Sequence, residues 1–293
     1  RWLYQQVSKT NFKTKYYKGR VMSLLIHPTA IVDKKAQIGN NVRIGAYCVI
    51  GDDVILHDNV CLHSHVVVEG PTVIGSETQI YQFCVIGTPA QHKLFKGEPA
   101  SLEIGKGNII REKVSIHRGT KIGGMKTVVG NNNFILADCH IAHDCNVGSN
   151  NILANCVALG GHVTLGNNCY MGAYSAVQQF VRIGDLAMIG AMAKVTEDII
   201  PYSIADGMPC RLRRINTIGL QRENFSKGQI SEIRAVYKRV FNESGDFASL
   251  LIEARKLLTD PDSLAWNLLE FINMRDKRPI CMQNKAKDVV TED

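Results

Sequence analysis

The chain has 293 residues, of which 45% are hydrophobic and 21% are charged, a composition typical of a water-soluble protein. It contains no run of about 18 apolar residues, so we predict no membrane span. The net charge of +7 comes almost entirely from residues 1–22, which carry six cations and no acid and leave 28 cations against 27 acids elsewhere. The nearly neutral body argues against a nucleic-acid partner.

Residues 1–22 form a basic leader in which aromatic side chains lie between the cations. Organelle transit segments are rich in cations and poor in acids, and this composition fits them. We therefore expect import into a mitochondrion, with a plastid as the alternative organelle. If the leader is instead a disordered arm, a cytoplasmic location is expected.

From Ile26 onward, an aliphatic residue recurs at every sixth position. The phase holds over residues 26–86, resumes over 104–122 and continues, shifted by one residue, over 129–195. A period of six fits neither the 3.6-residue period of a helix nor the two-residue period of a long strand. It predicts short strands separated by corners, three to a turn, so that each coil of a parallel β-helix contains 18 residues and lies ~4.8 Å from the next.

The other positions of the hexad support this prediction. Glycine often follows the aliphatic residue, and asparagine is frequent between strands; both tolerate the positive φ that tight corners require. Small residues precede the aliphatic residue by two places. The cysteines at this place are therefore predicted to be buried free thiols, since no C-x-x-C pair is present. They are Cys48, Cys84, Cys139, Cys145 and Cys169.

The repeat divides the chain into a leader, a β-helix over residues 23–200 and a C-terminal segment. Two stretches break the count. Residues 87–103 are predicted to form an external loop, which is where binding groups collect on a rigid scaffold. Residues 123–127 are interpreted as a short tolerated insertion.

Residues 201–293 are predicted to form a helical domain and a polar tail. The sequence Ser226-x-x-Gln229 is typical of a helix start. Two more amphipathic helices are expected over about 247–258 and 262–274.

Residues 18 apart should lie directly above one another in such a coil. His143, Gly161 and Gln179 form one such column. Because His140 precedes His143 by three residues and His162 follows Gly161, three histidines should gather on one face within two coils.

This cluster favours general base catalysis. A neutral imidazole can accept a proton from a sugar hydroxyl that attacks a thioester, and a carboxylate such as Asp144 can orient the ring. The backbone N–H of Gly161 could then donate to the developing oxyanion. A zinc site and a polar wall at a trimer interface remain open as alternatives from the residues alone.

Three segments resemble the UDP-N-acetylglucosamine acyltransferases of lipid A biosynthesis, which are hexapeptide-repeat enzymes. These are residues 116–120 (I-H-R-G-T), 137–145 (A-D-C-H-I-A-H-D-C) and 160–163 (G-G-H-V). The resemblance runs from about residue 26 into the helical segment. It implies a mainly β fold, a left-handed parallel β-helix followed by an α-helical domain, and a homotrimer with active sites between neighbouring prisms. With the basic leader, it suggests an organelle-targeted eukaryotic version.

The implied reaction moves a (R)-3-hydroxyacyl chain from acyl carrier protein to the 3-hydroxyl of UDP-N-acetylglucosamine, without a cofactor or metal. The resemblance assigns His143 as general base, Asp144 as its carboxylate partner and Gly161 as backbone oxyanion donor. The implied substrate-binding residues are Gln91, His92, His140, His162, Gln178, Gln179, Ala191, Asn216 and Arg222.

Within that set, Asn216 and Arg222 match positions that hold the nucleotide. Ala191 matches the residue that limits acyl-chain depth and carries a methyl group where glycine is usual. The chain also departs from the family, since His92 stands where an acid is typical and Gln178 where a histidine is common. These departures concern substrate contacts and leave the implied base unchanged.

Three other functions are rivals. A sister acyltransferase would act on an amino-sugar nitrogen or use acetyl-CoA, but those families carry different N-terminal domains or shorter prisms. A metalloenzyme of the γ-carbonic-anhydrase type also uses this fold, but the histidine spacings of three and nineteen residues do not match that class. A non-catalytic trimeric binding protein is the third rival, and the retention of His143 and Asp144 argues against it.

Overall fold

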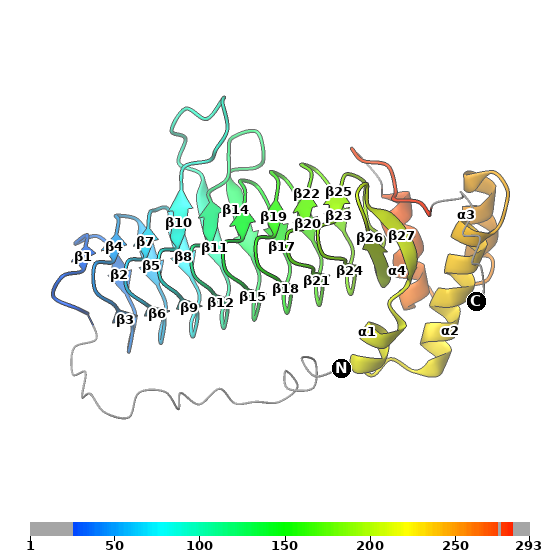
Figure 1. Ribbon diagram of the computed structural model, residues 1–293, viewed down its shortest axis with the longest axis horizontal. Helices are drawn as coiled ribbons and strands as arrows, with labels where there is room; N and C mark the ends of the chain where they lie inside the picture. The colour runs from blue at the N-terminus through cyan, green and yellow to red at the C-terminus, as the bar shows by residue number, and fades with distance from the viewer. Residues whose placement is uncertain (1–25, 275–276, 284–293) are drawn as a thin grey trace, which may run out of the picture.

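The computed structural model describes residues 26–274 and 277–283 (Figure 1). The predicted leader and nearly all of the predicted tail lie outside the described residues. The described chain forms a long parallel β-helix with helices at one end. Among the described residues, no helix is both long and apolar enough to cross a membrane.

The β-helix is a three-sided prism, and each side is one sheet whose neighbouring strands are three apart in sequence. Sheet A comprises β3 (Arg43–Ile44), β6 (Cys61–Leu62), β9 (Gln79–Ile80), β12 (Ile109–Ile110), β15 (Phe134–Ile135), β18 (Ile152–Leu153), β21 (Tyr170–Met171) and β24 (Met188–Ile189). Sheet B comprises β1 (Ile31–Val32), β4 (Val49–Ile50), β7 (Val67–Val68), β10 (Val85–Thr88), β13 (Ser115–His117), β16 (His140–Ile141), β19 (Ala158–Leu159), β22 (Ala176–Val177) and β25 (Lys194–Val195). Sheet C comprises β2 (Gln37–Ile38), β5 (Val54–Leu56), β8 (Thr72–Ile74), β11 (Ser101–Ile104), β14 (Lys126–Val129), β17 (Asn146–Val147), β20 (Thr164–Leu165) and β23 (Arg182–Ile183).

The strands pair in parallel with the predicted 18-residue register. Ile141 pairs with Leu159, which pairs with Val177, and all three side chains are at most 4% exposed. Burial of each such side chain contributes about 1.5–3 kcal/mol, so the stacked aliphatic columns supply the core. The five cysteines predicted to face this core are all buried free thiols.

Each corner of the prism requires one residue in the left-handed region of φ. In the coil that follows β15, Asp138, Asp144 and Asn150 have φ of 61°, 61° and 59°. Asn and Asp adopt this conformation at lower cost than most residues. The corners therefore explain the asparagines between strands. Most glycines that follow the aliphatic residue do not have positive φ, contrary to the prediction, and are required because the next coil lies so close: a Cβ at Gly148 would stand 2.6 Å from the Gly166 carbonyl oxygen.

Two loops project from the same side of the prism (Figure 1). Ile74 pairs with Ile104 at a separation of 30 residues, and Ile104 pairs with Val129 at a separation of 25. The first coil therefore has twelve extra residues, two whole hexads, which leaves the phase unchanged. The second has seven, one hexad and one residue, which produces the observed slip.

These loops correct three sequence predictions. The external loop is shorter than 87–103, because its ends belong to β10 and β11. The second loop is not confined to 123–127. It lies between β13 and β14 and includes Ile122, which is 66% exposed and does not belong to the aliphatic column. Ile122 matched the hexad phase only by coincidence.

The C-terminal region begins with strands, contrary to the prediction of a helical domain from residue 201. β26 (Ser203–Asp206) pairs in parallel with β24 and extends sheet A, and β27 (Arg211–Ile215) pairs antiparallel with β26. The helices are α1 (Thr217–Arg222), α2 (Lys227–Tyr237) with a π-helical continuation (Lys238–Asn242), α3 (Phe247–Arg255) and α4 (Leu264–Asn273). The capping box of Ser226 and Gln229 at the start of α2 is confirmed.

A buried ion pair ties the helices to the last coil. Arg182 Nη2 lies 2.7 Å from Oδ2 of Asp198, which is 1% exposed. The same guanidinium donates to the Phe271 carbonyl oxygen of α4 and lies over the Phe271 ring. Burial raises the pKa of the Asp198 carboxyl, and the contacts with Arg182 oppose that rise.

The final described segment, residues 277–283, is here called the C-terminal strap. The Asp198 N–H donates to the Pro279 carbonyl oxygen at 2.8 Å, and the Cys281 N–H donates to the Asp198 carbonyl oxygen at 2.8 Å. The strap thus adds one more extended segment to the end of the prism.

We predict that Arg182→Ala lowers the free energy of unfolding by about 3 kcal/mol, because it leaves the Asp198 carboxylate buried without its partner. Denaturant titration measures this loss. The control is Arg239→Ala, which removes a half-exposed pair with Glu243 and should cost about 0.5 kcal/mol. Equal losses in the two variants would contradict the assigned role of the buried pair.

Candidate active site

The candidate site lies at the prism edge where sheet B turns into sheet C, between β16 and β17. At this corner Nδ1 of His143 donates to Oδ2 of Asp144 at 2.7 Å. His143 is 3% exposed and the Asp144 side chain is fully buried. Because the carboxylate holds the Nδ1–H tautomer, the Nε2 lone pair of His143 is left to accept a proton.

The second loop holds the Asp144 carboxylate in place. Thr120 donates twice, from its N–H to Oδ1 and from its hydroxyl to Oδ2, both at 2.7 Å. Thr127 Oγ1 accepts from the Asp144 N–H at 2.8 Å. A Cβ at Gly123 would overlap the Asp144 carboxyl group, so the loop can close over this residue only with a glycine there.

Sequence analysis missed these two threonines as site residues. Thr120 ends the I-H-R-G-T motif, which was the one available signal. No such signal pointed to Thr127, because residues 123–127 were interpreted as an insertion.

Gly161 lies one coil beyond His143 and directly beneath its ring. A Cβ at Gly161 would stand 2.6 Å from Cε1 and 2.9 Å from Nε2 of His143, so any side chain would displace the imidazole. Among the described residues, the Gly161 N–H has no hydrogen-bond acceptor. The corner therefore presents an unobstructed backbone donor next to the His143 ring.

His162 and His92 complete the surroundings of His143. Nε2 of His162 lies 3.7 Å from Oδ2 of Asp144, and its ring is perpendicular to that of His143. Burial lowers the pKa of His162, while Asp144 acts in the opposite direction. His92 comes from the external loop and contacts the His143 ring edge-on, with 5.1 Å between centroids. Its neighbour Gln91 is exposed.

His140 lies on the sheet B side of the corner. Its Nδ1 is 2.8 Å from Ser115 Oγ, and burial lowers its pKa, with His117 and His143 lowering it further. His117 is 6% exposed and its Nδ1 donates to the Pro89 carbonyl oxygen of the external loop. Sequence analysis quoted His117 in a motif but did not predict that it would anchor the loop.

Two predicted residues lie elsewhere. Asn216 and Arg222 line a pocket of about 440 Å³ beside sheet A, together with Tyr170, Met188 and Arg214. Asn216 also caps α1 and donates to the Leu186 carbonyl oxygen at 2.9 Å. The edge between sheets B and C is opposite sheet A, so a single chain does not bring this pocket to His143.

Comparison with known proteins agrees with the site geometry. Residues 198–281 match the family model "Udp N-acetylglucosamine O-acyltransferase; Domain 2", and residues 35–70 and 126–161 match "Bacterial transferase hexapeptide (six repeats)". The acyl-[acyl-carrier-protein]–UDP-N-acetylglucosamine O-acyltransferase of Sinorhizobium fredii is 40% identical over 266 residues, covering 91% of this chain and 98% of the relative. That of Halorhodospira halophila is 45% identical over 218 residues, covering 74% and 84%.

Solved structures give the same result. The UDP-N-acetylglucosamine O-acyltransferase of Moraxella catarrhalis superposes with a TM-score of 0.84 at 38% identity, covering 88% of this chain and 100% of that one. The UDP-N-acetylglucosamine acyltransferase of Arabidopsis gives 0.75 at 33% identity, covering 88% and 100%. The chain belongs to the UDP-N-acetylglucosamine O-acyltransferase family. Its fold is accordingly the left-handed parallel β-helix that was predicted.

The remaining residues that were predicted to bind substrate in this acyltransferase lie on two different edges of the prism. Gln178 and Gln179 are exposed on the same edge as His143, two coils along. Ala191 is exposed on a different edge, where sheet A turns into sheet B. The structure therefore groups Gln178 and Gln179 with the His143–Asp144 pair but separates Ala191, Asn216 and Arg222 from it.

Among the residues that the structure describes, one group has the composition of a metal site. The ligand atoms of His143, Asp144 and His162 lie within 4.8 Å of one another. His143 Nδ1 and Asp144 Oδ2 are already in hydrogen-bond contact, so an ion between them, at about 2.0–2.2 Å from each, would require the ring to move. The observed hydrogen bond assigns Nδ1 of His143 to Asp144 and leaves Nε2 as the free nitrogen of the ring.

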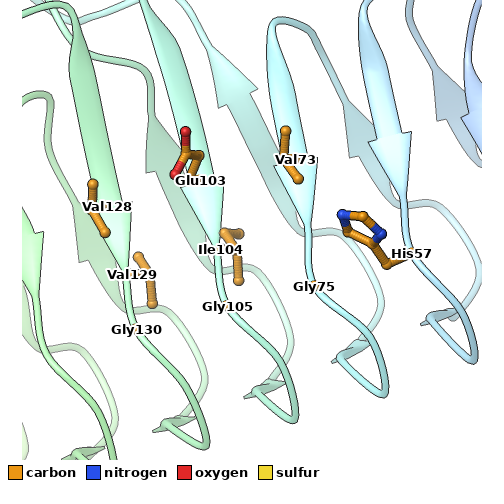
Figure 2. Close-up of a pocket in the computed structure, with 9 residues that line it drawn as sticks. All are labelled: His57, Val73, Gly75, Glu103, Ile104, Gly105, Val128, Val129 and Gly130. Atoms are coloured by element: carbon orange, nitrogen blue, oxygen red, sulfur yellow. The ribbon is translucent and has the colours of Figure 1, made fainter.

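A shallow hollow of about 260 Å³ lies elsewhere, on sheet C. Its walls come from β8, β11 and β14, with His57 at its margin (Figure 2). It contains none of the predicted site residues, and Glu103 in its wall pairs with Lys126. We assign no function to it.

Proposed function

We propose that this chain transfers a (R)-3-hydroxyacyl group from the thioester of acyl carrier protein to the 3-hydroxyl of UDP-N-acetylglucosamine, the first step of a lipid A-type synthesis. The observation that carries the proposal is the buried His143–Asp144 pair against the bare backbone of Gly161. The names of relatives at 40–45% identity support it.

In the proposed mechanism, His143 Nε2 accepts the proton of the 3-hydroxyl as its oxygen attacks the thioester carbonyl carbon. The Gly161 N–H donates to the oxyanion of the tetrahedral intermediate. When the carbon–sulfur bond breaks, the imidazolium returns the proton to the departing thiolate. Asp144 stabilises the imidazolium. Proton transfer through His143 and the hydrogen bond from Gly161 each raise the rate by a factor on the order of 10²–10³.

The other histidines supply polar contacts without adding charge. Burial lowers the pKa of His140 and His162 below their ordinary value, so both rings are neutral near pH 7. Neutral rings can donate to and accept from sugar hydroxyls. The positive charge that develops during the reaction is then confined to His143, beside the Asp144 carboxylate.

We further propose a homotrimer in which the edge of one prism that carries His143 faces sheet A of its neighbour. The separation of Asn216 and Arg222 from His143 supports this assembly, since a single chain would leave the nucleotide residues away from the base. An exposed apolar column on sheet B also supports it. Ile31, Val49 and Val85 are 67%, 40% and 36% exposed.

The basic leader is the basis for the proposed location of the protein in the cell. We propose that residues 1–22 direct import into a mitochondrion, which would make this chain an organelle-targeted eukaryotic member of the family. The similarity to the Arabidopsis enzyme supports a eukaryotic version.

We predict that His143→Ala lowers kcat by about 10³-fold in a thioester-release assay with UDP-N-acetylglucosamine and a panel of 3-hydroxyacyl carrier proteins. Thr120→Val keeps the N–H donor but loses the hydroxyl donor to Asp144, so it should lower kcat about tenfold. His57→Ala, an exposed histidine of the sheet C hollow, serves as the control and should leave kcat unchanged. Full activity of His143→Ala would refute the mechanism.

A mixing experiment tests the shared site. His143→Ala and Arg222→Ala should each be nearly inactive alone. Co-expressed at equal levels, they should regain about a quarter of native activity, because a site formed by two chains has both residues intact in one of four combinations. A site within one chain would regain none, since every chain carries one of the two changes.

The leader can be tested separately by fusing residues 1–25 to a fluorescent protein in eukaryotic cells. Mitochondrial fluorescence is expected, and replacing the six cations by glutamine should abolish it, because import depends on a cationic segment. Plastid or cytosolic fluorescence of the unmodified fusion would contradict the proposed location.

A further inference from the structure

The C-terminal strap carries two cations onto the catalytic edge. The strap (red in Figure 1) lies along the last coil, and its Ile280 and Cys281 are 5% and 1% exposed. These anchors and the backbone hydrogen bonds to Asp198 hold the strap against the prism. Its first two residues, Lys277 and Arg278, therefore have a defined position.

Both cations contact the column that contains Gly161. Arg278 Nε donates to the Gln179 carbonyl oxygen at 3.0 Å, and Lys277 Nζ lies 4.3 Å from the centre of the Phe180 ring. Gln179 follows Gly161 by one coil. The cations thus lie on the same edge as the proposed oxyanion donor.

A continuous row of side chains links Lys277 to the catalytic pair. The Phe180 ring stacks on His162 at 4.4 Å with an interplanar angle of 10°, and His162 lies 3.7 Å from Asp144. Asp144 and Phe180 are two coils apart, which is about 10 Å along the edge. Successive distances of 5.3 Å from His143 to His162, 4.4 Å on to Phe180 and 4.3 Å on to Lys277 limit the separation of the Lys277 ammonium nitrogen from the His143 ring to about 14 Å.

The two cations are available to an anion. Neither forms an ion pair within 4 Å among residues 26–274 and 277–283, whereas Arg182, on the neighbouring sheet, is paired with Asp198. Lys277 is exposed and Arg278 is half-buried. Arg278 uses Nε for the Gln179 carbonyl oxygen, which leaves its two Nη groups for another acceptor.

We propose that Lys277 and Arg278 bind the phosphodiester of the phosphopantetheine arm of the acyl donor, and thereby place its thioester beside Gly161. This inference rests on the proposed function. The arm has about thirteen bonds between sulfur and phosphorus, the length of about four residues, so it spans ~15 Å when extended. That span covers the separation of about 14 Å or less between the Lys277 ammonium nitrogen and the His143 ring.

The diphosphate of the sugar nucleotide fits this position less well. Only about five bonds separate the 3-hydroxyl oxygen from the nearer phosphorus, a span of ~6 Å. A phosphate on that short tether stays close to the sugar, and the proposed nucleotide residues, Asn216 and Arg222, lie beside sheet A and not on this edge. The cations of the strap are therefore left for the acyl donor.

The test compares two donors that differ only in the phosphate, a 3-hydroxyacyl thioester of 4′-phosphopantetheine and the same thioester of pantetheine. For Lys277→Ala and for Arg278→Ala, KM for the phosphorylated donor should rise about tenfold with kcat unchanged. KM for the unphosphorylated donor should not change. Lys277→Arg should restore most of the affinity, and Lys256→Ala, at the C-terminal end of α3, is the matched control and should affect neither donor.

Calorimetric binding of the two donors without sugar nucleotide gives the same comparison without turnover. It separates this inference from the proposed function, which is tested by native activity with the full acyl carrier protein. An equal loss for both donors would assign the two residues a structural role and overturn the inference. A rise in KM for UDP-N-acetylglucosamine alone would assign them to the nucleotide and would overturn it as well.

Discussion

The stacking of each coil on the one before it constrains every other feature of this protein. Aliphatic side chains fill the prism only if residues 18 apart lie above one another, and the parallel ladders of the three sheets maintain that register. Any chemistry must then be arranged in columns along the outside. His143, Gly161 and Gln179 form such a column, so the proposed base, the proposed backbone donor and the contact with Arg278 occupy one edge.

The corner of His143 and Asp144 forms where the repeat is interrupted. An uninterrupted corner would leave His143 and Asp144 open to solvent, because the interior holds only the aliphatic column and small residues. The second loop brings Thr120 to the carboxylate, and the external loop brings His92 to the imidazole. The rigid coils therefore set the positions of the functional groups, while the two loops remove water from them and complete their hydrogen bonds.

Most of the β-helix could be predicted because the period of six repeats the same local information many times. The pairing of His143 with Asp144 followed from adjacency, and the approach of His162 followed from the 18-residue register. Thr127, the hairpin of β26 and β27 and the position of Lys277 could not be predicted, since each depends on docking between segments far apart in the chain. Ile122 shows the converse error, because a loop residue can match a period by chance.

Because coils are added only as whole units, separations along the prism change in steps of about 4.8 Å. One more coil between His143 and the strap would move the two cations away from His143 by one such step, and one fewer would bring them nearer by the same amount. A ligand that contacts both His143 and the strap must therefore have a length that fits a whole number of coils. Point substitutions can change the contacts at each coil, but only the gain or loss of an 18-residue unit can change the spacing between the two contact points.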